Sequence, residues 1–95
     1  MPRYLVEVYL PRSRVHDAHV AASRVQATAE QLSREGVPVR HVRTTILPDD
    51  ETCFHVIEAL APGAVEELSE RAELGGVRIV TAIEASRPAR RRDTP

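Results

Sequence analysis

Hydrophobic and polar residues alternate along four short stretches of this chain, which is the pattern of β-strands. The four stretches are 3–10, 37–47, 52–60 and 77–85. The first places Tyr4, Val6 and Val8 on one face and Leu5 and Tyr9 on the other. Because apolar residues occur on both faces of this strand, we expect both faces to be covered at least in part.

Two other stretches repeat their apolar residues every three or four positions, the period of an amphipathic α-helix. In the first, the repeating residues are Val15, Ala18, Ala22, Val25, Ala29 and Leu32. In the second, which begins at Pro62, they are Ala64, Val65, Leu68, Ala72 and Leu74. Proline is favoured at the first position of a helix and glycine just after the last. We therefore expect Gly36 to end the first helix and Gly75-Gly76 to end the second.

The resulting order is strand, helix, strand, strand, helix, strand, the split βαβ arrangement of the ferredoxin-like fold. We predict an α+β sandwich in which an antiparallel sheet carries two helices on one face. The other face would carry the apolar residues Leu5, Tyr9, Phe54 and Val56. An exposed apolar sheet face marks an interaction surface. We therefore expect a homodimer of the dimeric α/β-barrel type, in which a second copy covers this face.

The hairpin between residues 37 and 60 contains most of the residues that can do chemistry, and its register depends on the length of its turn. A four-residue turn puts His41, Arg43 and Thr45 on one face with Phe54, Val56 and Glu58. A three-residue turn puts His41 and Arg43 with Cys53, His55 and Ile57, because a shift by one residue moves every side chain to the other face. We favour the four-residue turn, which gathers Val42, Ile46, Cys53, Ile57 and Ala59 on one apolar face.

Ninety-five residues suit one domain, and the charge divides that chain in two. The formal charge balance is −4 over residues 1–85 and +3 over residues 86–95. The second segment has two prolines, four arginines and no apolar pattern. We therefore predict a ferredoxin-like domain at 1–85 and a disordered, arginine-rich C-terminal tail at 86–95. Because the tail has no aromatic residue to stack on bases, we expect it to solubilise the protein and not to bind nucleic acid.

We predict the cellular compartment of the protein from sequence features that the chain lacks. It has one cysteine, which excludes an internal disulfide and fits a reducing environment. No apolar run approaches the about 18 residues of a membrane span, and the start of the chain has no signal-peptide pattern. We expect a cytoplasmic protein with no membrane partner.

A first candidate site lies on the strands. In the four-residue register His41 and Glu58 are cross-strand neighbours, and Glu7 lies on the adjoining strand. Imidazole and carboxylate together can bind a divalent metal or act as acid and base. A polar pair that only lines a dimer cavity is the alternative.

Two further pairs have the spacing of metal ligands. Cys53 and His55 point the same way on one strand, and thiolate with imidazole suits nickel, zinc or copper. Ordinary core packing is the alternative, since cysteine is among the most buried residue types. His16 and His19 lie about one turn apart near a helix start and could chelate a metal there. Two solvated surface histidines are the alternative for this pair.

No complete catalytic or cofactor motif occurs in the chain. It has neither a glycine-rich phosphate loop nor a Gly-x-Ser-x-Gly nucleophile elbow. We therefore expect a binding protein rather than an enzyme. The alternative is a dimeric α/β-barrel enzyme, or a small-molecule-binding module, that uses His41, Glu58 and Glu7 in a cavity between two sheets.

Short stretches along residues 3–84 resemble a family of small bacterial ferredoxin-like proteins. They are Tyr4-Leu5-Val6-Glu7, Val39-Arg40-His41-Val42-Arg43-Thr44, Cys53 to Ala59, Pro62, Ala64-Val65 and Arg78-Ile79-Val80. That family is described either as nickel-binding or as a domain of unknown function. The resemblance implies a dimeric ferredoxin-like domain and, as for some members, the binding of divalent nickel. The tail is not part of it.

The residues and the resemblance together lead us to expect a cytoplasmic, homodimeric protein that binds nickel or another divalent metal ion. We expect its ligands first in a strand cluster of His41, His55 and Glu58 with Cys53. The second expectation is the helix pair His16 and His19.

Overall fold

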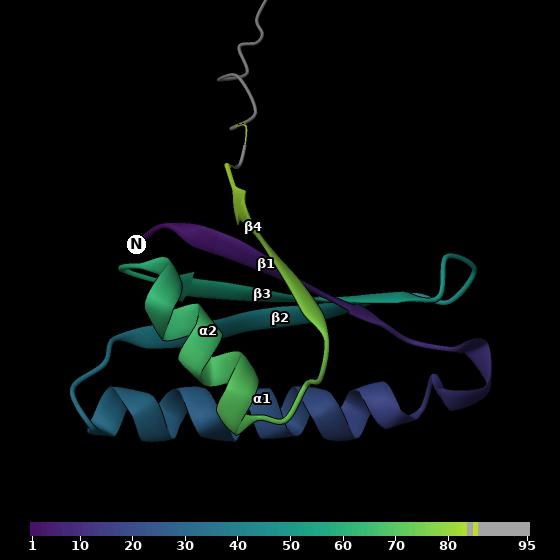
Figure 1. The fold of residues 1–95 in the computed structure, drawn as a ribbon, viewed down its shortest axis with the longest axis horizontal. Helices are drawn as coiled ribbons and strands as arrows, with labels where there is room; N and C mark the ends of the chain where they lie inside the picture. The colour runs from purple at the N-terminus through teal and green to yellow at the C-terminus, as the bar shows by residue number, and fades with distance from the viewer. Residues whose placement is uncertain (84, 86–95) are drawn as a thin grey trace, which may run out of the picture.

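The computed structural model describes residues 1–83 and 85, so the predicted tail at 86–95 lies outside the described residues. The elements are β1 (Arg3–Tyr9), a short 3-10 helix (Arg12–Arg14), α1 (Asp17–Arg34), β2 (Val39–Leu47), β3 (Thr52–Ala59), α2 (Pro62–Arg71) and β4 (Val77–Ala82) (Figure 1). Every strand pairs antiparallel with its neighbours, in one sheet of order β2-β3-β1-β4. The predicted α+β ferredoxin-like arrangement is confirmed.

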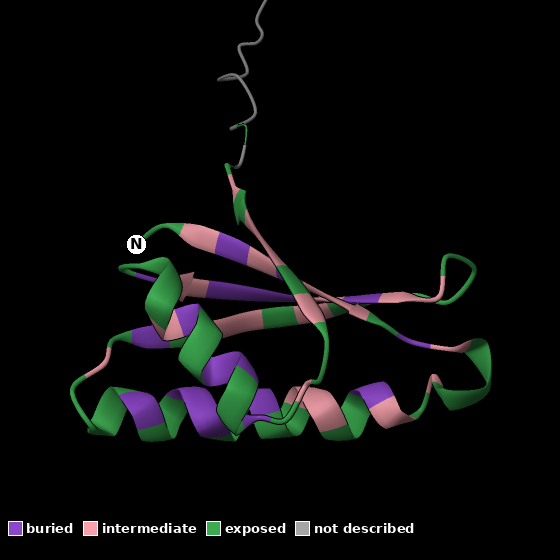
Figure 2. Cartoon of the chain, in the orientation of Figure 1, coloured by how far each residue is buried: buried purple, intermediate pink, exposed green. Residues whose placement is uncertain are grey.

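Both helices cover the same face of the sheet, and one hydrophobic core lies between them and the strands. The sheet contributes Tyr4, Val6, Val39, Ile57 and Ala59, and the two helical segments contribute Val25, Ala29, Leu32, Val65, Leu68 and Ala72. The buried positions lie on the sheet-facing sides of the helices (Figure 2). A smaller cluster of Leu10, Ala18 and Cys53 lies beside the main core. Because each large apolar side chain contributes about 1.5–3 kcal/mol when buried, these clusters supply most of the driving force for folding.

The two helices end by different means. Gly36 follows α1 with a φ of +94°, so the glycine ends this helix as predicted. In contrast, α2 ends at Arg71, before Gly75-Gly76 is reached. Glu73 takes the left-handed conformation there, with a φ of +57°, and the amide of Leu74 donates to the carbonyl of Ser69. The prediction that Gly75-Gly76 ends α2 is therefore wrong, because a glutamate occupies the left-handed position.

The turn between β2 and β3 has four residues, as we favoured. Leu47 pairs with Thr52, and Ile46 pairs with Cys53. The pairs Thr45–Phe54 and Arg43–Val56 also lie where the four-residue turn puts them. The register beside the turn is therefore confirmed.

A β-bulge at Val42 changes the register further from the turn. Arg43 pairs with Val56, whereas His41 pairs with Ile57. Because a bulge adds one residue to one strand, the side chains beyond it change faces. His41 therefore lies on the helix-covered face with Ile57, and the prediction that it faces Glu58 is wrong.

None of the described helices lies over the other face of the sheet. Its centre is apolar, because Leu5 of β1 pairs with Val56 on one side and Val80 on the other. Phe54 lies on this face and is partly exposed, and Tyr9 at its edge is 68% exposed. We call this surface the open face. Among the described residues, no helix is long and apolar enough to cross a membrane.

Candidate functional site: a polar chain through the core

Four polar side chains form a continuous chain on the helix-covered face of β2 and β3. Nε2 of His41 lies 2.9 Å from Oγ1 of Thr44, and the same oxygen lies 2.8 Å from Nδ1 of His55. Nε2 of His55 lies 3.9 Å from Sγ of Cys53. We call His41, Thr44, His55 and Cys53 the polar chain.

The bulge at Val42 is what assembles the outer end of the polar chain. In a regular strand, residues three apart point to opposite faces, so His41 and Thr44 would be separated by the sheet. With the extra residue between them, both side chains lie on the helix-covered face. The polar chain therefore depends on the one irregularity in this hairpin.

The inner end of the polar chain is deeply buried. His55 is 1% exposed, because β3 lies inside the sheet and His55 pairs with Val6 on one side and Thr44 on the other. Cys53 is 3% exposed and packs with Leu10. His41 is only partly buried and connects this interior to the surface.

Burial keeps the titratable members of the polar chain neutral. Burial first, and the nearby imidazole of His41 second, lower the pKa of His55 to about 4. Burial also lowers the pKa of His41, against a hydrogen bond to the backbone of Arg43 that raises it. Burial raises the pKa of the Cys53 thiol. At pH 7 the polar chain therefore contains two neutral imidazoles and one thiol.

This chemistry suits binding better than nucleophilic catalysis. A cysteine nucleophile reacts as the thiolate and needs contact with the substrate, but Cys53 is a buried thiol. Neutral imidazole, in contrast, is the form of histidine that binds a metal ion. The polar chain thus has two potential metal donors and no accessible nucleophile.

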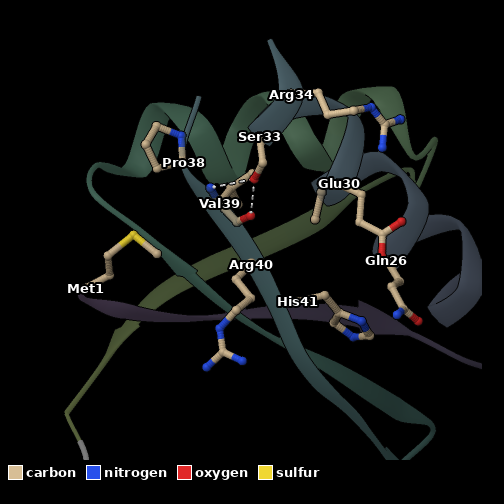
Figure 3. A pocket seen from close by; sticks show the side chains of 10 residues that line it. Met1, Gln26, Glu30, Ser33, Arg34, Pro38, Val39, Arg40 and His41 are labelled. Carbon is tan, nitrogen blue, oxygen red and sulfur yellow. Dashed lines mark hydrogen bonds between the residues drawn. The ribbon is translucent and has the colours of Figure 1, made fainter. Parts of the chain in front are cut away.

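The outer end of the polar chain opens into a groove of about 580 Å³ between α1 and β2. Ala29 and Val39 are the buried residues of its lining. Figure 3 shows Gln26 of α1 beside the imidazole of His41, with Glu30 one turn further along the helix. The groove gives solvent a route to His41.

The carboxylates predicted to join His41 lie on the open face. Glu58 bonds there to Arg3 and Arg40, each at 2.9 Å, and these hydrogen bonds hold the pKa of its carboxyl below the usual range. Glu7 faces Arg78 at 3.3 Å. The predicted cluster of His41, Glu58 and Glu7 is therefore not formed, because the sheet separates the imidazole from both carboxylates.

The predicted helix pair is a surface feature. His16 precedes α1 and His19 lies in its first turn, and both side chains are exposed. Nε2 of His16 lies 3.5 Å from a carboxylate oxygen of Asp17. No buried group converges on this pair in the described part of the chain.

Of the predicted ligands, the structure brings together His41, His55 and Cys53 and leaves Glu58, His16 and His19 apart. Within residues 1–83 and 85, no three His, Cys, Asp or Glu side chains gather as a metal-holding group. Sequence reasoning missed Thr44, which joins the two imidazoles. Its only signal was its place three residues after His41, which is informative only once the bulge is known.

Comparison of the chain with protein-family models, curated proteins and solved structures finds no match. The resemblance to nickel-binding proteins therefore stays a prediction.

Proposed function

We propose that this protein binds a divalent metal ion of the borderline class, nickel first, and that His41 and His55 are its protein donors. The observation that carries the proposal is that two imidazole nitrogens converge on one point. Nε2 of His41 and Nδ1 of His55 both lie within 2.9 Å of the Thr44 hydroxyl. Imidazole is a favoured ligand of nickel, zinc and copper.

The protonation state of the two imidazoles supports this assignment. A metal competes with protons for imidazole nitrogen, so a histidine with a lowered pKa binds with less competition near neutral pH. Both histidines of the polar chain have a lowered pKa. His16 and His19, in contrast, are exposed side chains at the start of α1.

The remaining predicted ligands have other parts in this proposal. Cys53 lies against Nε2 of His55, so it cannot bind the same ion as Nδ1 on the other side of the ring. It is placed to accept a hydrogen bond from Nε2–H, the outer contact that orients a metal-bound histidine. Glu58 is on the open face and takes no part. The rest of the coordination sphere would be water, supplied through the groove at His41.

Assembly is the second part of the proposal. We propose that two copies pair through their open faces, because Leu5, Phe54 and Val80 form an apolar centre that neither α1 nor α2 covers. A cytoplasmic location is proposed with it, on the ground of the single free thiol.

Calorimetric titration of the protein with Ni²⁺, Zn²⁺ and Co²⁺ at pH 7 tests the metal proposal. The variant His41→Ala removes the outer donor, and we expect it to abolish the binding heat. The double variant His16→Ala/His19→Ala is the matched control, because it removes two exposed imidazoles, and it should bind like the unmodified protein. No heat with any of the three ions would refute the proposal. Loss of binding in the control alone would place the metal on the surface of α1.

A further inference from the structure

We infer that Thr44 is a positioning residue, whose hydroxyl selects the tautomer of His55 and thereby prevents the two imidazoles from binding a metal together. The tautomer part of this inference stands on the hydrogen bonds of the polar chain alone. The effect on metal binding rests on the proposed function.

The hydrogens of the polar chain can be arranged in two ways, because a neutral imidazole carries hydrogen on only one nitrogen. In the outward arrangement, Cys53 S–H donates to Nε2 of His55, Nδ1–H of His55 donates to Thr44, and Thr44 O–H donates to Nε2 of His41. In the inward arrangement every bond is reversed. His41 Nε2–H then donates to Thr44, Thr44 O–H donates to Nδ1 of His55, and Nε2–H of His55 points at sulfur.

The surroundings of Cys53 favour the outward arrangement. In the inward arrangement, the buried Nε2–H of His55 would have only a sulfur 3.9 Å away as its acceptor. Sulfur is a weak acceptor, and a poorly satisfied donor in a protein core is unfavourable. In the outward arrangement Nε2 of His55 carries no hydrogen and therefore needs no acceptor. The buried end of the polar chain therefore places the hydrogen of His55 on Nδ1.

This tautomer has a consequence for the proposed metal site. A metal binds an imidazole nitrogen that carries no hydrogen, and in the outward arrangement Nδ1 of His55 carries one. Without the hydroxyl, sulfur is the only acceptor left beside His55 in the polar chain, so its hydrogen should move to Nε2. Nδ1 of His55 and Nε2 of His41 are then both free. Removing the hydroxyl should therefore open the site.

Nitrogen-15 NMR of the histidine side chains, recorded without metal at pH 7, tests the tautomer directly. We expect His55 to carry its hydrogen on Nδ1 in the unmodified protein and on Nε2 in Thr44→Val, which keeps the shape of the side chain. The matched control Thr44→Ser keeps the hydroxyl and should keep the Nδ1–H tautomer. If Thr44→Val does not fold, Thr44→Ala is the second variant. Hydrogen on Nε2 in the unmodified protein, or on Nδ1 in a folded variant without the hydroxyl, would overturn the inference.

Calorimetric titration of the same variants with Ni²⁺ separates this inference from the proposed function. Thr44→Ala is the variant for this titration, because the valine methyl of Thr44→Val would fill the place of the hydroxyl between the two nitrogens. If the competent tautomer is about a tenth of the population, Thr44→Ala should bind roughly tenfold more tightly than the unmodified protein and Thr44→Ser. A tautomer shift without metal binding in any variant would refute the proposed function and leave the role of Thr44 in place. Metal binding of equal strength in all three proteins would refute the role of the Thr44 hydroxyl in blocking metal binding and leave the metal site in place.

Discussion

The imidazole rings of His41 and His55 lie 6.2 Å apart between centroids and meet edge to face, at 61° between their planes. One threonine hydroxyl lies within hydrogen-bonding distance of both. Because each ring would repel a positive charge on the other, the pair resists protonation beyond the effect of burial alone. This relationship keeps two potential metal donors neutral inside a small domain.

Stability should fall between pH 6.5 and pH 4 because of His55. Its pKa is about 4 in the folded protein and about 6.5 in an unfolded chain. In this range the unfolded chain binds more protons than the folded one, so the free energy of unfolding falls as the pH falls. From pH 7.5 to pH 4.5, His55 should remove about 2–3 kcal/mol. Denaturant unfolding at several pH values and one protein concentration measures the effect.

The control for the pH prediction is His55→Leu, which fills a similar volume and cannot be protonated. Carboxyl groups with a lowered pKa, such as Glu58, also lose stabilising contacts in acid, but they are present in both proteins. The difference between the two stability curves therefore isolates His55. Curves that run parallel from pH 7.5 to pH 4.5 would show that burial does not shift this histidine.

The left-handed residue after α2 offers a stabilising substitution. Glu73 has a φ of +57°, a conformation that costs an L-residue about 1–2 kcal/mol and glycine almost nothing. Part of that gain is offset by the greater freedom of glycine in the unfolded chain. We expect Glu73→Gly to stabilise the protein by about 0.5 kcal/mol, measured by thermal or denaturant unfolding.

Glu66→Gly is the matched control for Glu73→Gly, because Glu66 is an exposed glutamate within α2 itself. Glycine in a helix interior is unfavourable, so this variant should lose about 1 kcal/mol. Opposite signs for the two substitutions are the expected result. A loss of stability in both would mean that the conformation of Glu73 contains no strain to relieve.

The open face should form a homodimer interface of about 1,200 Å² or more. Light scattering should give twice the chain mass of 10.5 kDa at micromolar concentration. Phe54→Glu places a charge on this face and should give a monomer. Val20→Glu is the control, because Val20 is 64% exposed on α1, away from the open face. A monomeric mass for the unmodified protein would contradict the prediction.

Most of the fold could be predicted from the sequence, because each element has a strong local pattern. Alternation located the four strands, and the period of three and four located both helices. The four-residue turn followed from the requirement that Ile46 share an apolar face with Cys53 and Ile57. These features depend on which residues avoid water, and a sequence shows that directly.

The bulge at Val42 could not be predicted, and the candidate site depends on it. Val42 is apolar and fits regular alternation, so nothing in the local pattern marks an extra residue there. The bulge moves His41 away from Glu58 and places it beside Thr44. Glu73 shows the same limit, since left-handed positions are expected at glycine and two glycines follow it. Both features are set by how the elements pack together.

The most direct test of the metal assignment is a Ni²⁺ titration followed by NMR of the four histidine side chains. Nickel is paramagnetic in octahedral coordination by nitrogen and oxygen, so it broadens the signals of the groups that bind it. We predict that the side-chain signals of His41 and His55 are lost at substoichiometric nickel while those of His16 and His19 stay sharp. Loss of the His16 and His19 signals first, with His41 and His55 unaffected, would contradict the assignment.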